Sequence, residues 1–338
     1  MKKILIVWTN NWPWDSRIQK QIDSLNKNGY EIHLACKNTN FLPIRECLGN
    51  LYIHRIRNIF RNKFLTNILS TPFFLNPIWF FHLLKIILEV SPKVIIVRDI
   101  PLILPCIVIA KIRNIKVILD MAENFHEMMK FNKKYNSNFI SRFLIKNLKI
   151  YKHIEEIAVN SVDHIYTVVE ESSKRIQEEY KLSGSKISIV SNTPTVLIPY
   201  NNKNKETKSL NLIYTGNIDA EFRGIDQVID AFEYLQDYPV VFNLIGDGPM
   251  KNLYIEKVKN LKLGNINFLG YMEHNNLLNF LATQDIGIVP HKKCKYIDTT
   301  IPNKLFDYML YSLPVIVSSA KPLKRIVEEE NCGYGCCC

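Results

Sequence analysis

Residues 210–248, LNLIYTGNIDAEFRGIDQVIDAFEYLQDYPVVFNLIGDG, hold the pattern that decides the fold. An apolar run at Leu210–Tyr214 precedes a segment of helical period at Ile225–Gln236 and a second apolar run at Val240–Ile245. Strands that alternate with helices in this way form βαβ units, in which the strands pair in parallel. The stretch therefore predicts a doubly wound α/β fold, and ligands are expected where its strands end.

The same alternation of apolar runs and helical segments continues through the chain of 338 residues. This length exceeds the roughly 250 residues at which a single hydrophobic core stops growing. Asn201–Ser209, NNKNKETKS, is the most polar and least periodic segment, which is typical of a linker. We therefore predict two doubly wound, Rossmann-like domains, over residues 1–195 and 196–338. Further strands are expected at Lys3–Trp8, Glu31–Cys36, Leu51–Ile56, Val94–Val97, Val117–Leu119, His164–Val169, Ile187–Val190, Ile266–Leu269, Ile286–Val289 and Val315–Val317, and further helices at Ser16–Asn28, Met250–Leu261, Leu277–Leu281 and after Pro302.

Two apolar runs and the end of the chain carry more specific expectations. Residues 94–97 and 314–317 are apolar throughout, so both are expected at sheet centres with helices on each side. No helical pattern stands out after Val317, so the second domain is expected to be truncated and to lack its C-terminal helix. The terminal cysteines, Cys332 and Cys336–Cys338, have neither metal-ligand spacing nor a prenylation signal, and their role stays open.

The composition indicates a globular protein with anionic partners. Hydrophobic residues make up 47% and charged residues 22% of the chain, which is far from the composition of disordered segments. Lys and Arg outnumber Asp and Glu by 43 to 32, and the resulting net charge of +11 favours anionic ligands. No zinc-finger spacing or RNA-binding aromatic motif is present, so no nucleic-acid partner is expected. No apolar run approaches the ~20 residues of a membrane-spanning helix, and the scattered cysteines indicate a cytoplasmic protein.

Two turns of the second half follow predicted strands, which is where open parallel sheets bind ligands. Thr215–Asn217 comes shortly before Arg223, whose guanidinium at a helix start would form an anion clamp with free amide groups. A lone arginine in such a place is more often a solvated charge. Gly246–Pro249, GDGP, indicates either a close approach to a ligand or a tight turn that needs positive φ.

The stretch from Pro302 to Pro314, PNKLFDYMLYSLP, predicts a helix whose start binds a phosphate. Pro302 fits the first turn, and Thr299 or Thr300 is expected to cap the helix. Asp307 lies about one and a half turns into the helix and would accept both hydroxyls of a ribose, as acidic residues do in nucleotide sites. The alternative is a surface helix with an aspartate that the helix dipole favours.

Charged side chains also follow the predicted strands of the first half. Asp15, Arg17, Asp99, Asp120 and Glu123 all stand at this position. Each carboxylate singly would be explained as a helix cap. Because the carboxyl ends of parallel strands meet at one edge of the sheet, the group as a whole predicts a polar crevice there.

These motifs together resemble glycosyltransferase family 4, the retaining enzymes of the GT-B fold. The resemblance covers nearly the whole chain, and its strength lies in several motifs in the right order. In the first half it rests on TNNWPWDSRIQKQIDSLNKNGYEIHLA and on LDMAENFHEMM, which looks like the Asp-x-x-Glu loop that faces the acceptor. In the second half it rests on YTGNIDAEFRGIDQVIDAF, NLIGDGPM, INFLGYM, DIGIVP and PNKLFDYMLYSLPVIVSS.

The resemblance implies that the second domain binds a nucleotide-diphosphate sugar and that the first domain binds the acceptor across a cleft. Arg223 matches the residue that holds the diphosphate, and Asp307 matches the second acid of the Glu-x7-Glu motif, the ribose ligand. The implied catalytic residues are Glu123, Asn124, Arg223 and Thr299. The implied donor site comprises Gly216, Asn217, Arg223, Gly246, Gly270, Tyr271, Asn303, Lys304, Leu305 and Asp307, and the acceptor side comprises Asn11, Asp15, Arg17, Asp99, Asp120 and His126.

The sequence departs from the family pattern in four places. Thr299 stands at the first acid of Glu-x7-Glu, so a carboxylate that grips the sugar hydroxyls is lost. Asn217 stands where a basic residue is usual, and Asn10–Trp12 replaces a glycine-rich loop. Ala122 stands where the Asp-x-x-Glu loop often has a histidine, which leaves Glu123, Asn124 or His126 for the polar role on the acceptor side.

The resemblance implies retaining transfer of a sugar to an acceptor hydroxyl, in the assembly of a cell-surface polysaccharide or glycolipid. It implies no cofactor and no metal ion, because Arg223 and a helix start would neutralise the leaving diphosphate. Two alternatives stay open at this point. One is a nucleotide-sugar 2-epimerase of the same fold, and the other is a protein that binds nucleotide sugars without turnover.

A basic and aromatic stretch in the first half suggests a further partner. Arg55–Phe64, RIRNIFRNKF, precedes the apolar Phe73–Leu88, and the two segments would seat the domain on an anionic membrane, where it meets a lipid-linked acceptor. A solvated basic edge beside a core helix is the alternative. The expected location is therefore cytoplasmic, with a peripheral place on the inner face of the cell membrane as the finer prediction.

Overall fold

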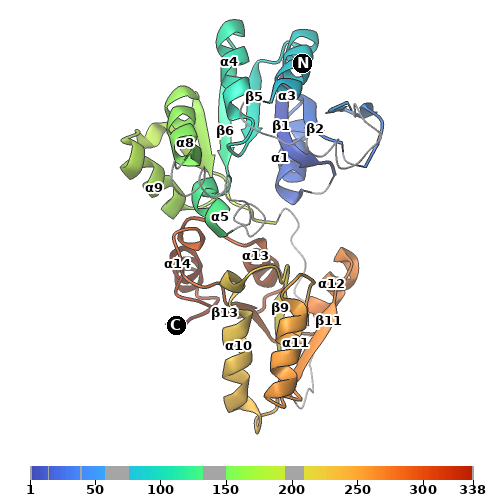
Figure 1. The fold of residues 1–338 in the computed structure, drawn as a ribbon, viewed down its shortest axis with the longest axis vertical. Helices are drawn as coiled ribbons and strands as arrows, with labels where there is room; N and C mark the ends of the chain where they lie inside the picture. The colour runs from blue at the N-terminus through green and yellow to red at the C-terminus, as the bar shows by residue number, and fades with distance from the viewer. Residues whose placement is uncertain are drawn as a thin grey trace. The chain divides into compact units, whose positions relative to one another are not determined.

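The computed structural model divides the chain into two compact units, Met1–Ser191 and Asn192–Cys338 (Figure 1). The sequence predicts this division between residues 195 and 196. The predicted linker at 201–208, the basic residues from 58 to 64, and Cys337 and Cys338 lie outside the described residues. The structure describes residues 2–13, 15–38, 40–57, 76–131, 150–194 and 209–336.

The first unit is built on an eight-stranded sheet in the order β3-β4-β2-β1-β5-β6-β7-β8. Neighbouring strands pair in parallel except for β3 and β4, which are antiparallel. All the predicted strands of this half are present, and β3 is an additional edge strand whose RECL sequence has no apolar run. The elements are β1 Lys3–Asn11, α1 Ser16–Lys27, β2 Glu31–Lys37, β3 Arg45–Leu48, β4 Leu51–Arg55, α3 Pro77–Val90, β5 Val94–Arg98, α4 Ile103–Arg113, β6 Lys116–Met121, α5 Phe125–Phe131, α8 Ile150–Ser161, β7 His164–Thr167, α9 Glu170–Tyr180 and β8 Ile187–Ile189.

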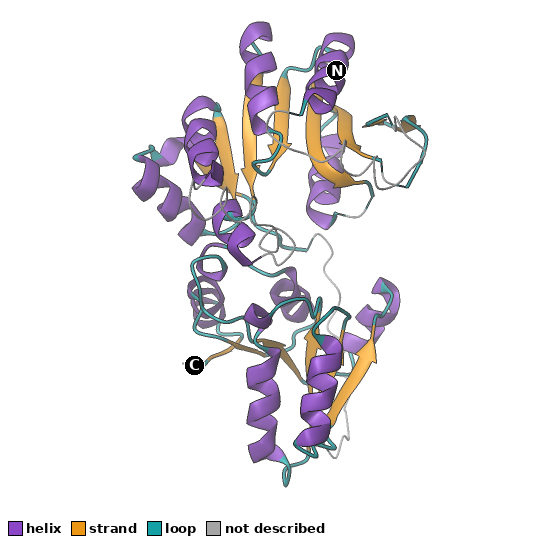
Figure 2. Cartoon of the chain, viewed as in Figure 1, coloured by secondary structure: helices purple, strands orange, loops and turns teal. Residues whose placement is uncertain are grey.

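Alternate side chains of β1 supply two separate cores, one on each face of this sheet. Leu5 and Val7 pack into the core that also contains buried residues of α3, α4 and α8. Ile6 points to the opposite face and packs with Ile18 and Ile22 of α1. Figure 2 shows strands flanked by helices in each unit. The predicted doubly wound architecture is therefore confirmed, and β5 lies at a sheet centre as expected, between β1 and β6.

The second unit has six parallel strands in the order β11-β10-β9-β12-β13-β14. This order runs outward in both directions from β9 and β12, so the sheet has a topological switch point between these two strands. In such sheets the crevice at the switch point is the usual place for a nucleotide. The elements are β9 Leu210–Thr215, α10 Ile225–Phe232, β10 Val240–Ile245, α11 Lys251–Asn260, β11 Ile266–Gly270, α12 His274–Leu281, β12 Ile286–Val289, α13 Asn303–Leu310, β13 Val315–Val317, α14 Lys321–Glu329 and β14 Gly333–Gly335.

Two expectations about the last part of the chain are wrong: that no helix follows Val317, and that a threonine caps the helix after Pro302. A helix, α14, follows β13 and buries Pro322, Leu323 and Val327. Leu323, Ile326 and Val327 stand at the i, i+3, i+4 spacing of an amphipathic helix, so the sequence does carry the signal for this short element. β13 lies inside the sheet as expected, with β12 on one side and β14 on the other. Finally, α13 begins at Asn303 with Pro302 at the N-cap, so neither threonine before it caps the helix.

Several described cysteines and helices bear on the predicted surroundings of the protein. Cys36 and Cys106 are buried as expected of core residues, whereas Cys47 is exposed and Cys294 is half-buried. No helix within the described ranges is both long enough and apolar enough to cross a membrane.

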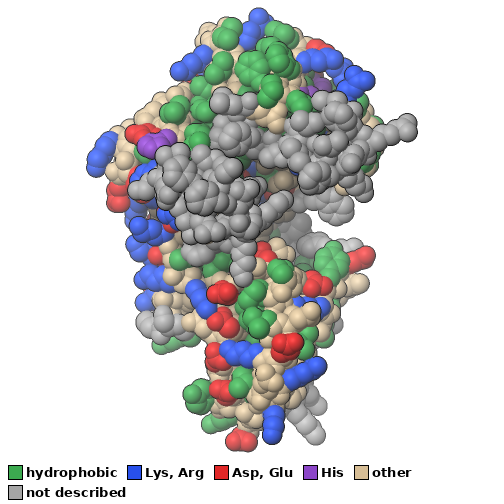
Figure 3. All heavy atoms as spheres, viewed as in Figure 1, with side chains coloured by type: hydrophobic (Ala, Val, Ile, Leu, Met, Phe, Trp, Pro, Cys, Tyr) green, Lys and Arg blue, Asp and Glu red, His purple; other side chains and the backbone are tan. Residues whose placement is uncertain are grey.

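On the face shown in Figure 3, Lys and Arg side chains alternate with Asp and Glu side chains over the second unit. The excess positive charge therefore does not gather into one patch on this face of that unit.

A single tyrosine ties α13 to the strands at the switch point. Tyr308 is fully buried, and its hydroxyl accepts a hydrogen bond from the backbone N–H of Thr215 at 2.9 Å. Its ring lies flat against β12, where a Cβ at Gly287 would come within 2.3 Å of it. Position 287 therefore has to be glycine if α13 is to reach the sheet.

Gly287→Ala is expected to destabilise the second unit by about 1–3 kcal/mol, because the new methyl group forces the buried Tyr308 ring or β12 to shift. Differential scanning calorimetry measures this loss. The matched control is Gly264→Ala, whose Cβ meets nothing within 4 Å and whose effect should stay within about 0.5 kcal/mol. Equal melting temperatures for the two variants would contradict the packing described here.

Candidate functional site

Backbone segments cross closely where β9 and β10 end. Gly216 and Gly246 have φ values of +128° and +148°, which strain any other residue. A Cβ at Gly246 would lie 1.9 Å from the carbonyl oxygen of Gly216. The N–H of Gly246 donates to the carbonyl oxygen of Gly270, the last residue of β11, whose φ is +74°. The predicted donor-site glycines thus meet at one edge of the sheet, and their first role is to let the strand ends approach.

A second close approach joins the segment after β9 to the end of β12. Gly224 has a φ of +72°, and a Cβ on it would lie 1.8 Å from the carbonyl oxygen of Pro290. This contact places Arg223 beside His291, with 3.2 Å between Nη1 of the arginine and Nε2 of the histidine. His291 is buried. Sequence reasoning missed this residue, because a lone histidine after an apolar run carries no motif.

Arg223 is held in place by a carboxylate and an aromatic ring. Its Nε and Nη2 donate to the two carboxylate oxygens of Asp219 at 2.9 and 3.3 Å. Its guanidinium also lies over the ring of Phe222. Although burial works against the charge, the bond to Asp219 raises the pKa of Arg223, so the side chain is a permanent cation. Arg223 is therefore not the freely solvated charge that the sequence also allowed, because its guanidinium is held in one orientation.

The protonation of His291 follows from its neighbours. Burial, together with the positive charges of Lys304 and Arg223, holds the pKa of His291 well below its usual range. Arginine has donors only, so Nε2 of a neutral His291 accepts from Arg223 and its proton is assigned to Nδ1. His291 therefore orients the guanidinium without adding a charge.

Lys304, the second residue of α13, is buried within the same edge of the sheet. It is 8% exposed, and Nζ lies 3.5 Å from the ring centre of Tyr214. Nζ finds no hydrogen-bond partner among the described residues. A Cβ at Gly216 would be 3.0 Å from it. Lys304 therefore lies directly beneath the turn after β9.

The other predicted residues of α13 divide between core and surface. Leu305 is fully buried and Asn303 is exposed, whereas Asp307 is partly exposed and interacts electrostatically with Lys304. Pro302 makes no side-chain bond to the helix start, which leaves that start open for an acceptor group such as a phosphate. The role of Asp307 as a ribose ligand stays a prediction.

Two further predicted donor-site residues lie on turns, and the predicted catalytic Thr299 ends a short 3-10 helix. Asn217 is exposed directly after Gly216, and Tyr271 is 78% exposed after β11. Thr299 is buried, and its hydroxyl donates within its own turn toward the carbonyl oxygens of Lys295 and Tyr296, both at 3.1 Å. The hydroxyl of Thr299 therefore already has acceptors in the protein.

The first unit compensates its buried charges internally. Asp120 is fully buried, and its carboxylate accepts from Arg17, whose Nη2 is 2.5 Å from Oδ1. Gln21 donates to it at 2.7 Å and Arg98 at 3.4 Å. Although burial works against ionisation, the two arginines keep the pKa of Asp120 low. Asp120 and Arg17, both predicted on the acceptor side, therefore serve first to hold α1, β5 and β6 together.

Asp99, at this edge of the sheet, is a carboxyl whose pKa is raised toward neutrality. It follows β5 with a left-handed φ of +60°, and its Oδ1 accepts from the N–H of Ala122 at 3.3 Å. Burial raises its pKa to about 7; Arg98 opposes this, and the negative charges of Glu123 and Asp120 reinforce it. The structure therefore brings Asp99, Asp120 and Glu123 together electrostatically, as the sequence predicts.

The remaining predicted residues of the first unit have local roles as well. Asp15 caps α1, since its Oδ1 accepts from the N–H of Ile18 at 2.8 Å. Asn124 is buried and accepts from the N–H of Glu127 at 3.3 Å at the start of α5. His126 is buried in the same helix, and Asn11 ends β1 with its carbonyl oxygen bonded to Nε1 of Trp8. The cap explanation thus holds for Asp15.

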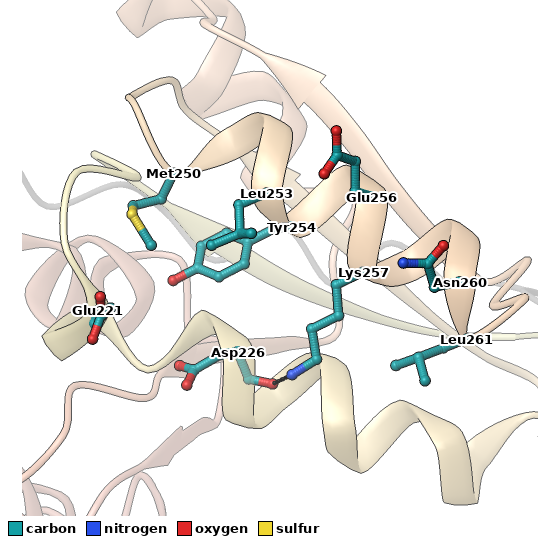
Figure 4. A pocket seen from close by; sticks show the side chains of 9 residues that line it. All are labelled: Glu221, Asp226, Met250, Leu253, Tyr254, Glu256, Lys257, Asn260 and Leu261. Atoms are coloured by element: carbon teal, nitrogen blue, oxygen red, sulfur yellow. Dashed lines mark hydrogen bonds between the residues drawn. The ribbon is translucent and has the colours of Figure 1, made fainter.

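A pocket elsewhere on the second unit is less suited to a diphosphate. It lies between α10 and α11, has a volume of about 450 Å³, and is shown in Figure 4. The carboxylates of Glu221, Asp226 and Glu256 line it, and Lys257 is its only cation. The Nζ of Lys257 already donates to the backbone carbonyl oxygen of Asp226 at 3.2 Å. An excess of carboxylates repels an anion, so the switch point remains the candidate site.

Comparison with known proteins defines the class to which this site belongs. Residues 209–337 match the family model of glycosyl transferases group 1. The second unit therefore matches this family model over most of its length, as the sequence motifs indicate. Over 98 residues it is 30% identical to the putative colanic acid biosynthesis glycosyl transferase WcaI of Escherichia coli K12, and this match spans 29% of the chain and 24% of WcaI.

Solved structures show the same fold over the whole chain. Sucrose-phosphate synthase from Thermosynechococcus elongatus matches with a TM-score of 0.74 and 14% identity, over 99% of this chain and 86% of that one. Anabaena HepE in complex with UDP matches with a TM-score of 0.66 and 12% identity, over 99% and 85%. The predicted GT-B fold is thus confirmed.

Asp99→Asn is expected to stabilise the protein at pH 8 and to change little at pH 4. The folded-state pKa of about 7 lies above the unfolded value near 3.9. The folded state therefore binds more protons between these two values, and stability declines as pH rises through that interval. Asparagine removes this decline. Melting temperatures measured from pH 4 to pH 8 test the difference.

Asp163→Asn supplies the matched control on the same unit, with the opposite sign. Burial works against its charge, but hydrogen bonds from Lys116 and from the N–H of Val117 lower the pKa of Asp163. The ionised carboxylate of Asp163 stabilises the folded state at pH values above its unfolded-state pKa, and this stabilisation is lost as the pH falls. Asp163→Asn should therefore lower stability at pH 8. If Asp99→Asn also lowered stability at pH 8, the assignment of Asp99 would be refuted.

Proposed function

We propose that this protein is a retaining glycosyltransferase that moves a sugar from a nucleotide-diphosphate sugar to an acceptor hydroxyl. One observation carries the proposal: within a group 1 glycosyltransferase domain, Arg223 is oriented at the switch point between β9 and β12. An oriented cation at this place suits a leaving diphosphate. The UDP named for HepE, a protein of the same fold, supports a nucleoside diphosphate as the ligand class.

Electrostatic stabilisation of the leaving group is the step that this chain's residues would perform. Negative charge develops on the diphosphate as the bond to the sugar breaks, and Arg223 and the open start of α13 would stabilise it. The guanidinium of Arg223 would act without reorganisation, because Asp219 and His291 already hold it in place. Asp307 would bind the ribose hydroxyls. The leaving phosphate would lie near the incoming hydroxyl, with no committed covalent nucleophile and no metal ion.

The acceptor is assigned to the first unit, where Asp99 and Glu123 lie near each other at the strand ends. Carboxyl groups of this kind bind sugar hydroxyls well, because each oxygen accepts a hydrogen bond. The similarity of part of the chain to WcaI supports an acceptor in polysaccharide or glycolipid assembly. In this proposal Asp120 contributes indirectly, since Arg17 and Arg98 occupy its carboxylate.

Arg223→Ala and Asp307→Ala are each expected to reduce transfer at least 100-fold, because each removes a direct contact to the diphosphate or the ribose. The assay offers a panel of nucleotide-diphosphate sugars to the protein together with membrane extracts or short oligosaccharides, and follows nucleotide release and product mass. Arg325→Ala and Asp230→Ala, at ion pairs on α14 and α10, are matched controls that should stay within twofold of the wild type.

Full activity of either site variant would overturn the site assignment. The same assay after treatment with EDTA tests the metal-free mechanism. Activity should stay within twofold, and a loss that magnesium restores would show that a metal ion takes part.

A peripheral seat on an anionic membrane is part of the proposal. On α3, Phe81 is 66% exposed and Leu88 is 51% exposed, with Lys85 between them. Apolar side chains next to a cation favour the interface of an anionic bilayer. Flotation with vesicles containing anionic lipid at low salt should carry the wild type upward, and Phe81→Ser with Leu88→Ser should weaken this. If the wild type stays at the bottom of the gradient while the vesicles float, the proposed membrane association is refuted.

A further inference from the structure

The pocket between α10 and α11 contains two buried polar atoms that lack partners among the described residues. Tyr254 on α11 is 2% exposed, and its hydroxyl has no hydrogen-bond partner there. Oδ1 of Asp226, in the first turn of α10, is buried and unpartnered in the same way. Both residues line the pocket, and Figure 4 shows the hydroxyl of Tyr254 directed toward Asp226. Because a buried polar group without a partner costs free energy, the two atoms together indicate that the pocket binds a polar ligand.

The charges around these atoms select the kind of ligand. Carboxylates outnumber ammonium groups in the lining, with Glu221, Asp226 and Glu256 against Lys257. Lys257 is itself occupied, because it forms an ion pair with Asp230 and donates to the backbone carbonyl oxygen of Asp226 at 3.2 Å. Burial raises the pKa of Tyr254 to about 12, and the negative charges of Asp226 and Glu221 add to this effect, so the hydroxyl keeps its proton. The pocket therefore repels anions and favours a cation.

An ammonium group suits these atoms better than a metal ion does. Oδ2 of Asp226 accepts a hydrogen bond from Nζ of Lys292 at 2.6 Å, so this carboxylate already binds one ammonium group through one of its oxygens. The described residues include no group of three or more His, Cys, Asp or Glu side chains that could hold a metal ion. An ammonium group needs only hydrogen-bond acceptors, and Oδ1 of Asp226 and the hydroxyl oxygen of Tyr254 are both acceptors.

The rest of the lining is apolar and suits an alkyl chain. Met250, Leu253 and Leu261 complete this part of the pocket, and Leu253 is 54% exposed. Methylene groups that cover such side chains remove apolar surface from water. The volume of about 450 Å³ lies within the range of small-molecule sites, about 300–1,000 Å³. A ligand with an ammonium head and an alkyl body therefore matches both parts of the pocket.

We propose that the pocket between α10 and α11 binds an alkylammonium ion, with its nitrogen between Asp226 and Tyr254 and its methylene groups against Leu253 and its apolar neighbours. The ion donates hydrogen bonds to Oδ1 of Asp226 and to the hydroxyl oxygen of Tyr254. The pocket shares no lining residue with the switch-point site around Arg223, so this inference does not depend on the proposed transfer of a sugar. A pocket that only holds water would not distinguish an amine from an alcohol of the same length.

The test compares three ligands of the same chain length that differ in charge. Titrations of the whole chain with n-butylamine, 1-butanol and butyrate at neutral pH are followed by two-dimensional NMR of the backbone amides, which reports both affinity and location. n-Butylamine should bind at least tenfold more tightly than either of the other two, because hydrogen bonds to charged groups are the stronger ones. The largest shifts should fall on residues 221–226 and 250–261.

Two variants tie this binding to the two unpartnered atoms. Tyr254→Phe removes only the hydroxyl and should weaken the binding of n-butylamine by about threefold to tenfold, and Asp226→Asn should weaken it by about tenfold or more. Tyr234→Phe is the matched control, since Tyr234 is 82% exposed and does not line the pocket, and it should stay within twofold of the wild type. Without ligand, Tyr254→Phe should melt at the same or a higher temperature, because its hydroxyl has no partner to lose.

Absence of amine binding, or equal binding of n-butylamine and 1-butanol, would overturn the inference. Amine binding that neither Tyr254→Phe nor Asp226→Asn weakens would overturn it too, because the amine would then bind elsewhere on the acidic surface. A clear loss of melting temperature in Tyr254→Phe without ligand would have the same consequence, since the hydroxyl would then have a partner within the protein.

Discussion

The close backbone approach of Gly216 to Gly246 is the contact on which the binding edge of the second unit depends. No Cβ fits between the two residues, because it would lie 1.9 Å from the carbonyl oxygen of Gly216. The approach lets β9 and β10 end side by side with their turns interlocked. A second close backbone approach, of Gly224 to the carbonyl oxygen of Pro290, joins the segment after β9 to the end of β12. Side chains that leave these turns therefore converge at the switch point.

The two units treat buried charge at this edge in opposite ways. In the first unit Arg17 and Arg98 pair with Asp120, and Arg98 also lies beside Asp99, although its Nε has no hydrogen-bond partner among the described residues. In the second unit Arg223 is paired with Asp219, whereas Nζ of Lys304 has no hydrogen-bond partner among the described residues. A compensated cluster stabilises a fold, and an uncompensated one favours an anionic ligand. This difference supports the donor on the second unit.

Sequence reasoning predicted the strands well and the roles of single residues less well. The apolar runs of β5 and β9 are continuous because helices cover both faces of a parallel sheet, and this is visible without a structure. α14 is not among the predicted helices, although Leu323, Ile326 and Val327 have helical spacing, because the segment is only nine residues long. Thr299 and Asp15 were assigned to ligands although their oxygens bond to nearby backbone. A short polar side chain can bind either a ligand or the neighbouring backbone, and local sequence does not distinguish these two roles.

The sequence by itself determined the fold class, the family and the order of the motifs, because these depend on periodicity and on spacing along the chain. Only the tertiary structure decided which side chains meet. His291 carries no motif, and it becomes part of the candidate site because β9 and β12 are neighbours. Lys304 is one residue of a helix start in the sequence, 88 positions after Gly216. Packing of Tyr308 on Gly287 holds that helix against the sheet, and this places the charge of Lys304 under the turn.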